Sequence, residues 1–392
     1  MRYDDFLYST IDIPHEVWKL FGYPELVRLR GISQAVLPVE CNPFCTAANR
    51  FQHGLGVWWL GELVCRNRKF RHLHPHLSLA GLLHDAGNPP FSHLSEPFLH
   101  SATGHDGETY LREVLPDSKL AQELESLGAD LDLICDLVSG SRRPFSDLLC
   151  GSLDLDNLDN VARYYGLRGN GGLSFNPEQV ACAFTYFEPE GRIVLNESMR
   201  GQVQSWKAVR KSLYHGVYSD PHLALAIMLF RAVGLAFKAE ELPGIFWKYT
   251  DRQALEWLKL HCNYGSRQLV SLVERLQPFA CVIRWSGSQE PEKDLVWSGW
   301  EVRENMADHI SDILGCESWQ VAVYVGKGRD VKPVSVPFWN GVGGLTYDED
   351  REAPVWRVRI YVHPQVASQL NIQRPDPLDL LRVISKKLQP VT

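Results

Sequence analysis

Apolar positions in the first 280 residues follow the spacing of helices rather than that of strands. Residues 53–64 and 76–87 are apolar on most faces, as in buried helices. Gly87 is a typical residue for ending the second of these helices, and Ser152 or Asp154 can cap a helix at 156–167. Amphipathic helices are also predicted at 107–115, 118–127, 205–218, 222–237, 252–261 and 266–276.

The pattern changes after about residue 280. Runs of β-branched and aromatic residues with partial alternation predict strands at 319–326, 331–339 and 355–363, and a closing helix follows at 377–388. We therefore expect a mainly α fold. A helical domain would occupy residues 1–285, and a smaller α+β lobe would occupy residues 286–392.

Composition narrows the class of protein. The 392 residues are 45% hydrophobic and 22% charged, which is ordinary for a globular chain. A net charge of -7 gives no general attraction to nucleic acid, but it does not exclude a local basic pocket. The nine cysteines contain no C-x-x-C pair, and neither a secretory leader nor an apolar stretch of ~18 residues is present. These features predict a cytoplasmic protein without a membrane partner.

Four ionisable residues lie at or near the ends of apolar helices: His53, His84, Asp85 and Asp156. Charged groups are rarely buried without partners, and two imidazoles with two carboxylates suit a divalent ion such as Fe, Mn, Zn, Ni or Co, and Mg less well. In the alternative interpretation, His84 and Asp85 form a surface turn and Asp156 is a capping charge. Spacing alone does not separate the two, because ligands from distant segments have no fixed register.

Three motifs surround these residues: NRFQH at 49–53, LLHDAGNPPFSH at 82–93 and SLDLDNLDNVAR at 152–163. They resemble the signature blocks of HD-domain metal-dependent phosphohydrolases, in particular the deoxynucleoside triphosphate triphosphohydrolase (dNTPase) branch. VRLRGISQ at 27–34 and VRKSLYHGVY at 209–218 resemble further segments of that branch. The resemblance implies a helical HD fold, a nucleotide substrate, a homo-oligomer, and a divalent metal held by His53, His84, Asp85 and Asp156.

The same resemblance implies roles for other residues. His93, His105 and Glu96 would handle protons near the α-phosphate, with Glu96 orienting His105. The substrate-binding set would include Arg50 and Arg210 on phosphates, Tyr218 against the sugar and Gln34 near the sugar or base. The local alternatives are a structural ion pair for Arg50, core packing for Tyr218 and a polar surface loop around His105.

The sequence departs from the branch at six positions, two of which are Asp220 and Pro221 in place of a basic pair. Asn88 stands where a histidine is usual, and Asn157 stands where a phosphate-binding lysine is usual. Asn160 and Tyr164 replace a tyrosine and an aspartate that touch the sugar. These asparagines and Tyr164 remain substrate-binding candidates, but positive charge for a phosphate tail is reduced. Replacement charge is expected from Arg163, Arg168 and Lys211.

The leading hypothesis is a metal-dependent nucleotide phosphohydrolase that attacks a dNTP at its α-phosphate and releases a deoxynucleoside and triphosphate. An HD phosphodiesterase or nucleotidase acting on other nucleotides or oligonucleotides is an alternative, favoured by Asn157, Asn160 and Tyr164. A nucleotide-sensing module with a vestigial HD site is a third, which the complete ligand set counts against. The metal stays open among Mn, Fe, Co, Ni, Zn and Mg.

Overall fold

The computed structural model describes residues 1–42, 48–168, 172–217, 221–287, 300–327, 334–349 and 356–369. It is predominantly helical with small sheets, which confirms the predicted fold class. Two compact units interleave along the chain. Unit 1 comprises Met1–Tyr214, Ile245–Ala254 and Pro333–Glu352, and unit 2 comprises His215–Gly244, Leu255–Lys332 and Ala353–Thr392. The chain passes between the two units several times. The predicted domain boundary at residue 285 stays a prediction.

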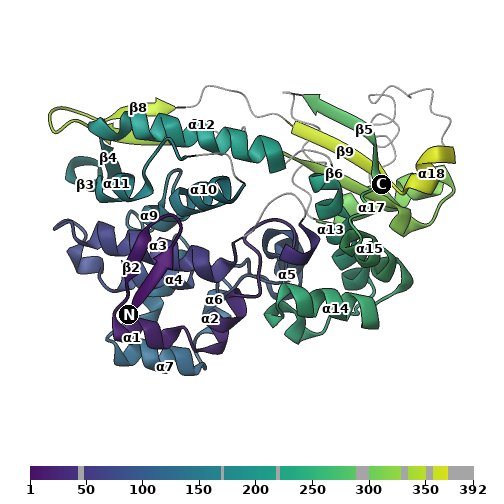
Figure 1. The fold of residues 1–392 in the computed structure, drawn as a ribbon, viewed down its shortest axis with the longest axis horizontal. Coiled ribbons are helices and arrows are strands. Elements are labelled where there is room, and N and C mark those ends of the chain that lie inside the picture. Colours follow the sequence, from purple (N-terminus) through teal and green to yellow (C-terminus); the bar gives the residue numbers. More distant parts are fainter. Residues whose placement is uncertain are drawn as a thin grey trace, which may run out of the picture. The chain divides into compact units, whose positions relative to one another are not determined.

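Two apolar helices form the centre of unit 1 (Figure 1): α3 (Arg50–Cys65) and α4 (His76–Leu83). Asn49 caps α3, since its side chain accepts from the Gln52 amide at 2.9 Å while Gln52 accepts from the Asn49 amide. A Cβ at Gly54 would lie 2.9 Å from the Leu82 carbonyl oxygen, so glycine permits a close approach of the helices. This approach brings the end of α4 beside His53.

The prediction that Gly87 ends the second helix is wrong. Helix α4 ends at Leu83, with His84 as its C-cap. Gly87 instead allows close backbone packing, because a Cβ there would lie 2.2 Å from the Gly107 carbonyl oxygen. The early stop frees residues 84–88 to turn toward the other polar groups of unit 1.

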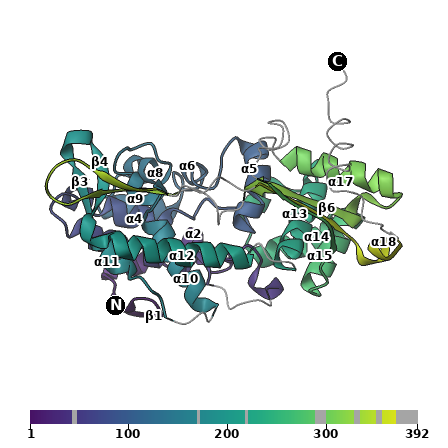
Figure 2. The same cartoon turned by 90° about the horizontal axis from the view of Figure 1, so that it is seen from above.

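Helix α10 (Leu155–Leu167) begins as predicted at Asp154, whose Oδ1 accepts from the Asn157 amide at 2.7 Å. Helix α12 (Arg200–Val217) lies beside it in both views (Figures 1 and 2), and Trp206 Nε1 donates to the Asn157 carbonyl at 3.3 Å. The N-terminal hairpin pairs β1 (Arg2–Asp5) with β2 (Ser9–Asp12).

The larger sheet of unit 1 joins distant parts of the chain in the order β3-β4-β7-β8. Its strands are β3 (Phe184–Phe187), β4 (Arg192–Asn196), β7 (Ser335–Trp339) and β8 (Thr346–Glu349). Strand β7 is part of the run predicted at 331–339, but it runs parallel to β4 in unit 1, with Leu195 opposite Phe338. The remaining helices of unit 1 are α1 (His15–Leu20), α2 (Pro24–Leu29), α5 (Glu96–Thr103), α6 (Leu111–Val114), α7 (Lys119–Ser126), α8 (Leu131–Val138), α9 (Asp147–Cys150) and α11 (Pro177–Cys182).

Unit 2 packs helices against an antiparallel sheet of order β5-β9-β6. Its strands are β5 (Ala280–Gly287), β6 (Val321–Lys327) and β9 (Trp356–Val362), and its helices are α13 (His222–Lys238), α15 (Tyr264–Glu274), α17 (Trp300–Leu314) and α18 (Pro364–Gln369). Helices α13 and α17 lie against β6 (Figure 2). The helix predicted at 377–388 lies outside the described residues.

Helix α13 is apolar because it is buried in unit 2, where the Ala232 carbonyl accepts from Ser266 Oγ at 2.8 Å. Over the described ranges, no single helix has the length and hydropathy of a membrane span. Only the bent pair Glu197–Val217 and His222–Lys238 meets that criterion, and only when the two are taken together.

Candidate metal centre

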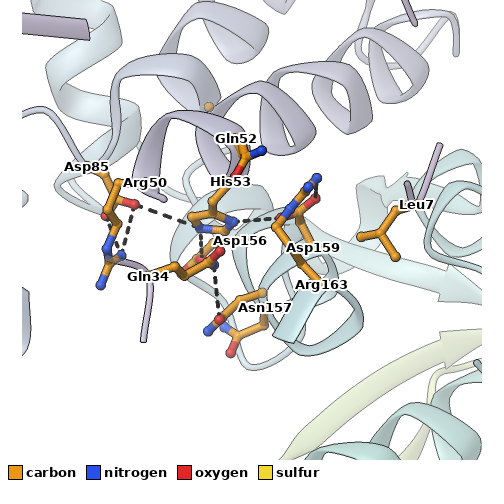
Figure 3. Close-up of polar contacts among 12 residues, drawn as sticks. Leu7, Gln34, Arg50, Gln52, His53, Asp85, Asp156, Asn157, Asp159 and Arg163 are labelled. Carbon is orange, nitrogen blue, oxygen red and sulfur yellow. Dashed lines mark hydrogen bonds and ion pairs between the residues drawn. The ribbon is translucent and has the colours of Figure 1, made fainter. Parts of the chain in front are cut away.

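Three side chains from three helices of unit 1 converge on one point: His53 from α3, His84 from the end of α4 and Asp156 from the first turn of α10. Figure 3 shows His53 and Asp156 pointing toward one another. Their ligand atoms all lie within 4.8 Å of one another. His53 Nε2 is 3.2 Å from His84 Nε2 and 2.9 Å from Asp156 Oδ1. Both imidazoles are buried, whereas the Asp156 side chain is 34% exposed. The cluster is therefore open to solvent on the Asp156 side.

The second nitrogen of each imidazole is held by an oxygen acceptor. His84 Nδ1 lies 2.7 Å from the Gly81 carbonyl, and His53 Nδ1 lies 2.7 Å from Asp159 Oδ2. Such outer partners orient metal-ligating histidines and direct the other nitrogen at the ion. Burial opposes protonation of His53, but hydrogen bonds with Asp156 and Asp159 raise its pKa to about 9. A bound cation would take the place of that proton, so these residues fit a divalent metal.

Asp85, the fourth predicted ligand, lies beside the cluster. Its Oδ2 is 3.4 Å from His84 Nε2 and 3.9 Å from His53 Nε2. Arg50 Nη1 contacts both carboxylate oxygens at 2.8 and 2.9 Å. Burial raises the pKa of Asp85, but the charges of Arg50, His84 and His53 together outweigh it and bring the pKa to about 2. The carboxylate is thus ionised and oriented, and its ligation of a metal stays a prediction.

Asn88 and Arg50 both orient Asp85. Asn88 Nδ2 donates to Asp85 Oδ1 at 2.6 Å, and Arg50 Nε donates to Ser92 Oγ at 3.1 Å. Arg50 is only 6% exposed. It therefore makes the structural ion pair that was its alternative role, while its contact with a phosphate stays a prediction. Asn88 is thus a buried hydrogen-bond partner of Asp85.

The expectation that Arg163 supplies replacement charge for a phosphate is wrong. Arg163 is 1% exposed, and it binds Asp159 through Nε and Nη2 and Asp5 through Nη1, all at 2.9 Å. Its charge is neutralised inside unit 1, because two buried carboxylates surround it.

The structure pairs Glu96 with His93 rather than with His105, the partner predicted for it. Glu96 Oε2 lies 2.8 Å from His93 Nδ1, since α5 begins at Glu96 only three residues after His93. His105 Nε2 lies 3.6 Å from Glu113 Oε1. His93 and Glu96 are thus the orienting pair, and the predicted pairing of His105 with Glu96 is corrected.

The predicted substrate residues contact one another or buried groups. Gln34 Nε2 donates to Asn160 Oδ1 at 3.1 Å, and Asn157 Nδ2 donates to Asp154 Oδ1 at 2.9 Å. Tyr164 is buried beneath the Arg168 guanidinium, and buried Arg210 lies over the rings of Trp206 and Tyr214. Tyr218 lies outside the described residues. Substrate contacts by these residues stay predictions.

Asp159 is a site residue that the sequence did not single out. It is fully buried, and it bonds His53 Nδ1 and Arg163 (Figure 3). It also accepts from the Tyr8 hydroxyl at 2.8 Å. Burial raises its pKa, but the charge of Arg163 and the hydrogen bond from His53 bring it to about 2. Its place one helical turn after Asp156, inside the motif at 152–163, is the sequence signal that could have identified it.

Residues 50–164 match the protein family described as the HD domain. An uncharacterised protein of Methanocaldococcus jannaschii is 24% identical over 286 residues, 72% of this chain and 59% of the relative. The deoxynucleoside triphosphate triphosphohydrolase SAMHD1 homologue of Dictyostelium discoideum is 25% identical over 192 residues, 41% of this chain and 36% of the relative. The match covers less than two thirds of each relative's own length.

Two solved structures share the fold. A hypothetical protein from Aquifex aeolicus superposes with a TM-score of 0.72 at 18% identity, covering 94% of this chain and 98% of that one. A phosphohydrolase from Bacteroides thetaiotaomicron superposes with a TM-score of 0.65 at 18% identity, covering 92% and 99%. At this identity the likeness concerns the fold.

Proposed function

Because residues 50–164 of this chain form an HD domain, we propose that the protein is a metal-dependent nucleotide phosphohydrolase. The observation that carries the proposal is the convergence of His53, His84 and Asp156, whose ligand atoms lie within 4.8 Å of one another. A bound divalent metal lowers the pKa of water and polarises a phosphoryl oxygen. The Asp156 side chain is 34% exposed, and we propose that a phosphate approaches the cluster from that side.

The chain's own residues orient this chemistry. Asp159 and the Gly81 carbonyl fix the two imidazoles, while Arg50 and Asn88 fix Asp85. His93 has its Nδ1 hydrogen-bonded to Glu96, so its Nε2 is the nitrogen available to exchange a proton. We assign to His93 the delivery of a proton to the leaving oxygen.

We further propose that the substrate is a dNTP. Water attacks the α-phosphorus, the bond to the 5′ oxygen breaks, and the departing oxygen takes a proton, so a deoxynucleoside and triphosphate leave. The resemblance of the three motifs and the name of the Dictyostelium relative support this choice. We also propose a cytoplasmic location and a homo-oligomer. Free thiols such as Cys65 and Cys135 support a reducing compartment.

The test is hydrolysis of a nucleotide panel by the metal-loaded protein, with its metal content measured on the same sample. The panel contains the dNTPs, NTPs, nucleoside monophosphates, cyclic nucleotides and short oligonucleotides. We expect triphosphate and deoxynucleoside from dNTPs with the wild type and neither product with His84→Ala. Cleavage of another phosphoester without triphosphate would reject the dNTP assignment, and hydrolysis by His84→Ala equal to wild type would reject the metal-dependent mechanism.

A phosphodiesterase or nucleotidase acting on a less charged nucleotide is the second candidate. The observation that favours it is the commitment of two arginines near the cluster. Arg50 is ion-paired to Asp85, and Arg163 is ion-paired to Asp159 and Asp5. A triphosphate carries more negative charge than a phosphodiester, so it loses more when these cations are neutralised internally. The same panel separates the two candidates.

A further inference from the structure

One buried carboxylate joins segments of unit 1 that are far apart in sequence. Asp251 is the first residue of α14 (Asp251–His261) and is 3% exposed. Its Oδ1 accepts from the Phe91 amide and its Oδ2 accepts from the Ser33 amide, both at 2.8 Å. Each oxygen therefore has its own backbone donor from a different segment.

The hydrogen bond from the Phe91 amide to Asp251 Oδ1 holds a strained loop. Phe91 and Ser92 have φ values of 62° and 48°, in the left-handed region that non-glycine residues rarely adopt. Such conformations persist only where surrounding contacts fix them. The Asp251 bond to the Phe91 amide is one such contact, and Ser92 Oγ accepts from Arg50 Nε. His93 follows at once, so its place depends on this loop.

The hydrogen bond from the Ser33 amide to Asp251 Oδ2 holds the segment that pairs with the start of α3. Ser33 forms an antiparallel bridge with Asn49, the N-cap of α3, and the Ile32 carbonyl accepts from the Arg50 amide at 2.9 Å. Helix α3 carries His53 one turn later. A single carboxylate thus links the backbone of the His93 loop to the backbone that precedes His53.

Arg28 strengthens the same connection. Its Nη2 donates to the Trp247 carbonyl at 3.1 Å and to the Asn88 carbonyl at 2.5 Å, and its Nε donates to the Lys248 carbonyl at 3.0 Å. Burial lowers the pKa of Arg28 to about 10, which leaves it charged at neutral pH. The stretch that leads to Asp251 is therefore attached to the turn beside Asp85.

We propose that Asp251 is a positioning residue of the candidate centre, whose carboxylate holds the Ser92–His93 loop in register with the start of α3. The inference rests on the proposed function and adds a residue whose side chain accepts from backbone amides and not from the candidate metal ligands. Only a carboxylate accepts from both amides, because an asparagine would direct its NH₂ group at one of the two donors. Asp251→Asn therefore removes one of the two backbone hydrogen bonds while preserving the size of the side chain.

The experiment compares Asp251→Asn and Asp251→Glu with the matched control Glu241→Gln. Glu241 in unit 2 also accepts from a backbone amide, that of Asn263 at 2.7 Å. Asp251→Asn is expected to lower kcat by about 10–100-fold with KM changed by less than about twofold, since His93 is displaced without losing substrate contacts. Asp251→Glu keeps both acceptor oxygens and is expected to recover part of kcat. Glu241→Gln is expected to change Tm alone.

Two readouts do not depend on turnover. Hydrogen exchange at the Phe91 or Ser33 amide is expected to accelerate by about tenfold or more in Asp251→Asn. The ¹⁵N signal of His93 Nδ1, which reports its bond to Glu96, is expected to move. Wild-type kcat in Asp251→Asn, or an unchanged His93 signal, would overturn the inference. A wild-type protein that hydrolyses no phosphoester counts against the proposed function alone, because exchange and the His93 signal still decide this inference.

Discussion

Arg163 in unit 1 and Arg231 in unit 2 are each buried between two carboxylates, and the two networks end differently. In unit 1, Arg163 binds Asp159 and Asp5, and Asp159 continues to the His53 imidazole. In unit 2, Arg231 binds Glu304 and Asp308, and it also donates to Ser318 Oγ at 2.6 Å. Both arginines are 1% exposed.

The unit 1 network ends on the His53 imidazole, whose Nε2 contacts the partly exposed Asp156 carboxylate. The unit 2 network ends on Ser318 and on Lys238, whose Nζ contacts Asp308 at 2.6 Å. The two arginines are equally buried, and each pairs with two carboxylates. A buried charge network therefore indicates a functional site only where it orients a group that can bind a ligand. We expect substitutions in unit 2 to change stability alone.

The largest expected effect is on activity at the site end of the unit 1 network. Asp156→Ala should reduce hydrolysis on the order of 10³-fold, because it removes a ligand of the proposed metal. Asp308→Ala is the matched control, since the two side chains are 34% and 35% exposed. It should lower Tm and leave kcat as in the wild type. A similar loss of kcat in both variants would remove the distinction between the networks.

Removing either arginine should destabilise the protein by about 3–5 kcal/mol, because buried carboxylates lose their partner. Arg163→Met and Arg231→Met test this by urea unfolding. Only Arg163→Met should also weaken Mn²⁺ binding, by about 10–100-fold, since Asp159 would no longer be fixed against His53. Equal metal affinity in both variants would show that the unit 1 network does not reach the site.

Glu304 gives the unit 2 network a pH dependence. Burial raises its pKa to about 7, although the charge of Arg231 lowers it. A raised folded pKa favours the protonated form, so its contribution is complete below about pH 4.5 and is lost as the pH rises through about 7. The free energy of unfolding should thus fall across this window by up to roughly 3 kcal/mol. Glu304→Gln should flatten that slope, and an unchanged slope would contradict the assignment.

The smallest effects are expected at the two peripheral contacts. Tyr8→Phe removes one of several hydrogen bonds to Asp159 and should cost about 1 kcal/mol with slightly weaker Mn²⁺ binding. Lys238→Ala removes a partly exposed ion pair with Asp308 and should cost less than about 1 kcal/mol with unchanged Mn²⁺ binding. Calorimetric unfolding and Mn²⁺ titration of both variants check the contrast.

The sequence predicted what depends on local pattern. Apolar periodicity located α3, α10 and α13, and Asp154 was recognised as a cap because capping is a property of neighbouring residues. The motifs also selected His53, His84 and Asp156, which the structure brings together.

The sequence did not predict the partners that hold these groups. Asp159 joins His53 across 106 positions and Asp251 joins Phe91 across 160, and no spacing rule connects such residues. The predicted role of Arg163 was wrong for the same reason, since Asp5 approaches it from the N-terminal hairpin. The pairing of strand β7 was not predicted either, because the residue pattern of a strand does not specify which other strand it pairs with.

The central claim is that His53, His84 and Asp156 hold a metal that hydrolysis requires. The most direct test strips the protein with a chelator, restores Mn²⁺ stepwise and measures bound metal and nucleotide hydrolysis on the same sample. We predict that hydrolysis disappears on stripping and returns in proportion to bound metal, reaching its plateau at about one ion per chain, and that His84→Ala neither binds the ion tightly nor recovers activity. Hydrolysis that persists in the stripped protein, or tight Mn²⁺ binding by His84→Ala, would contradict the claim.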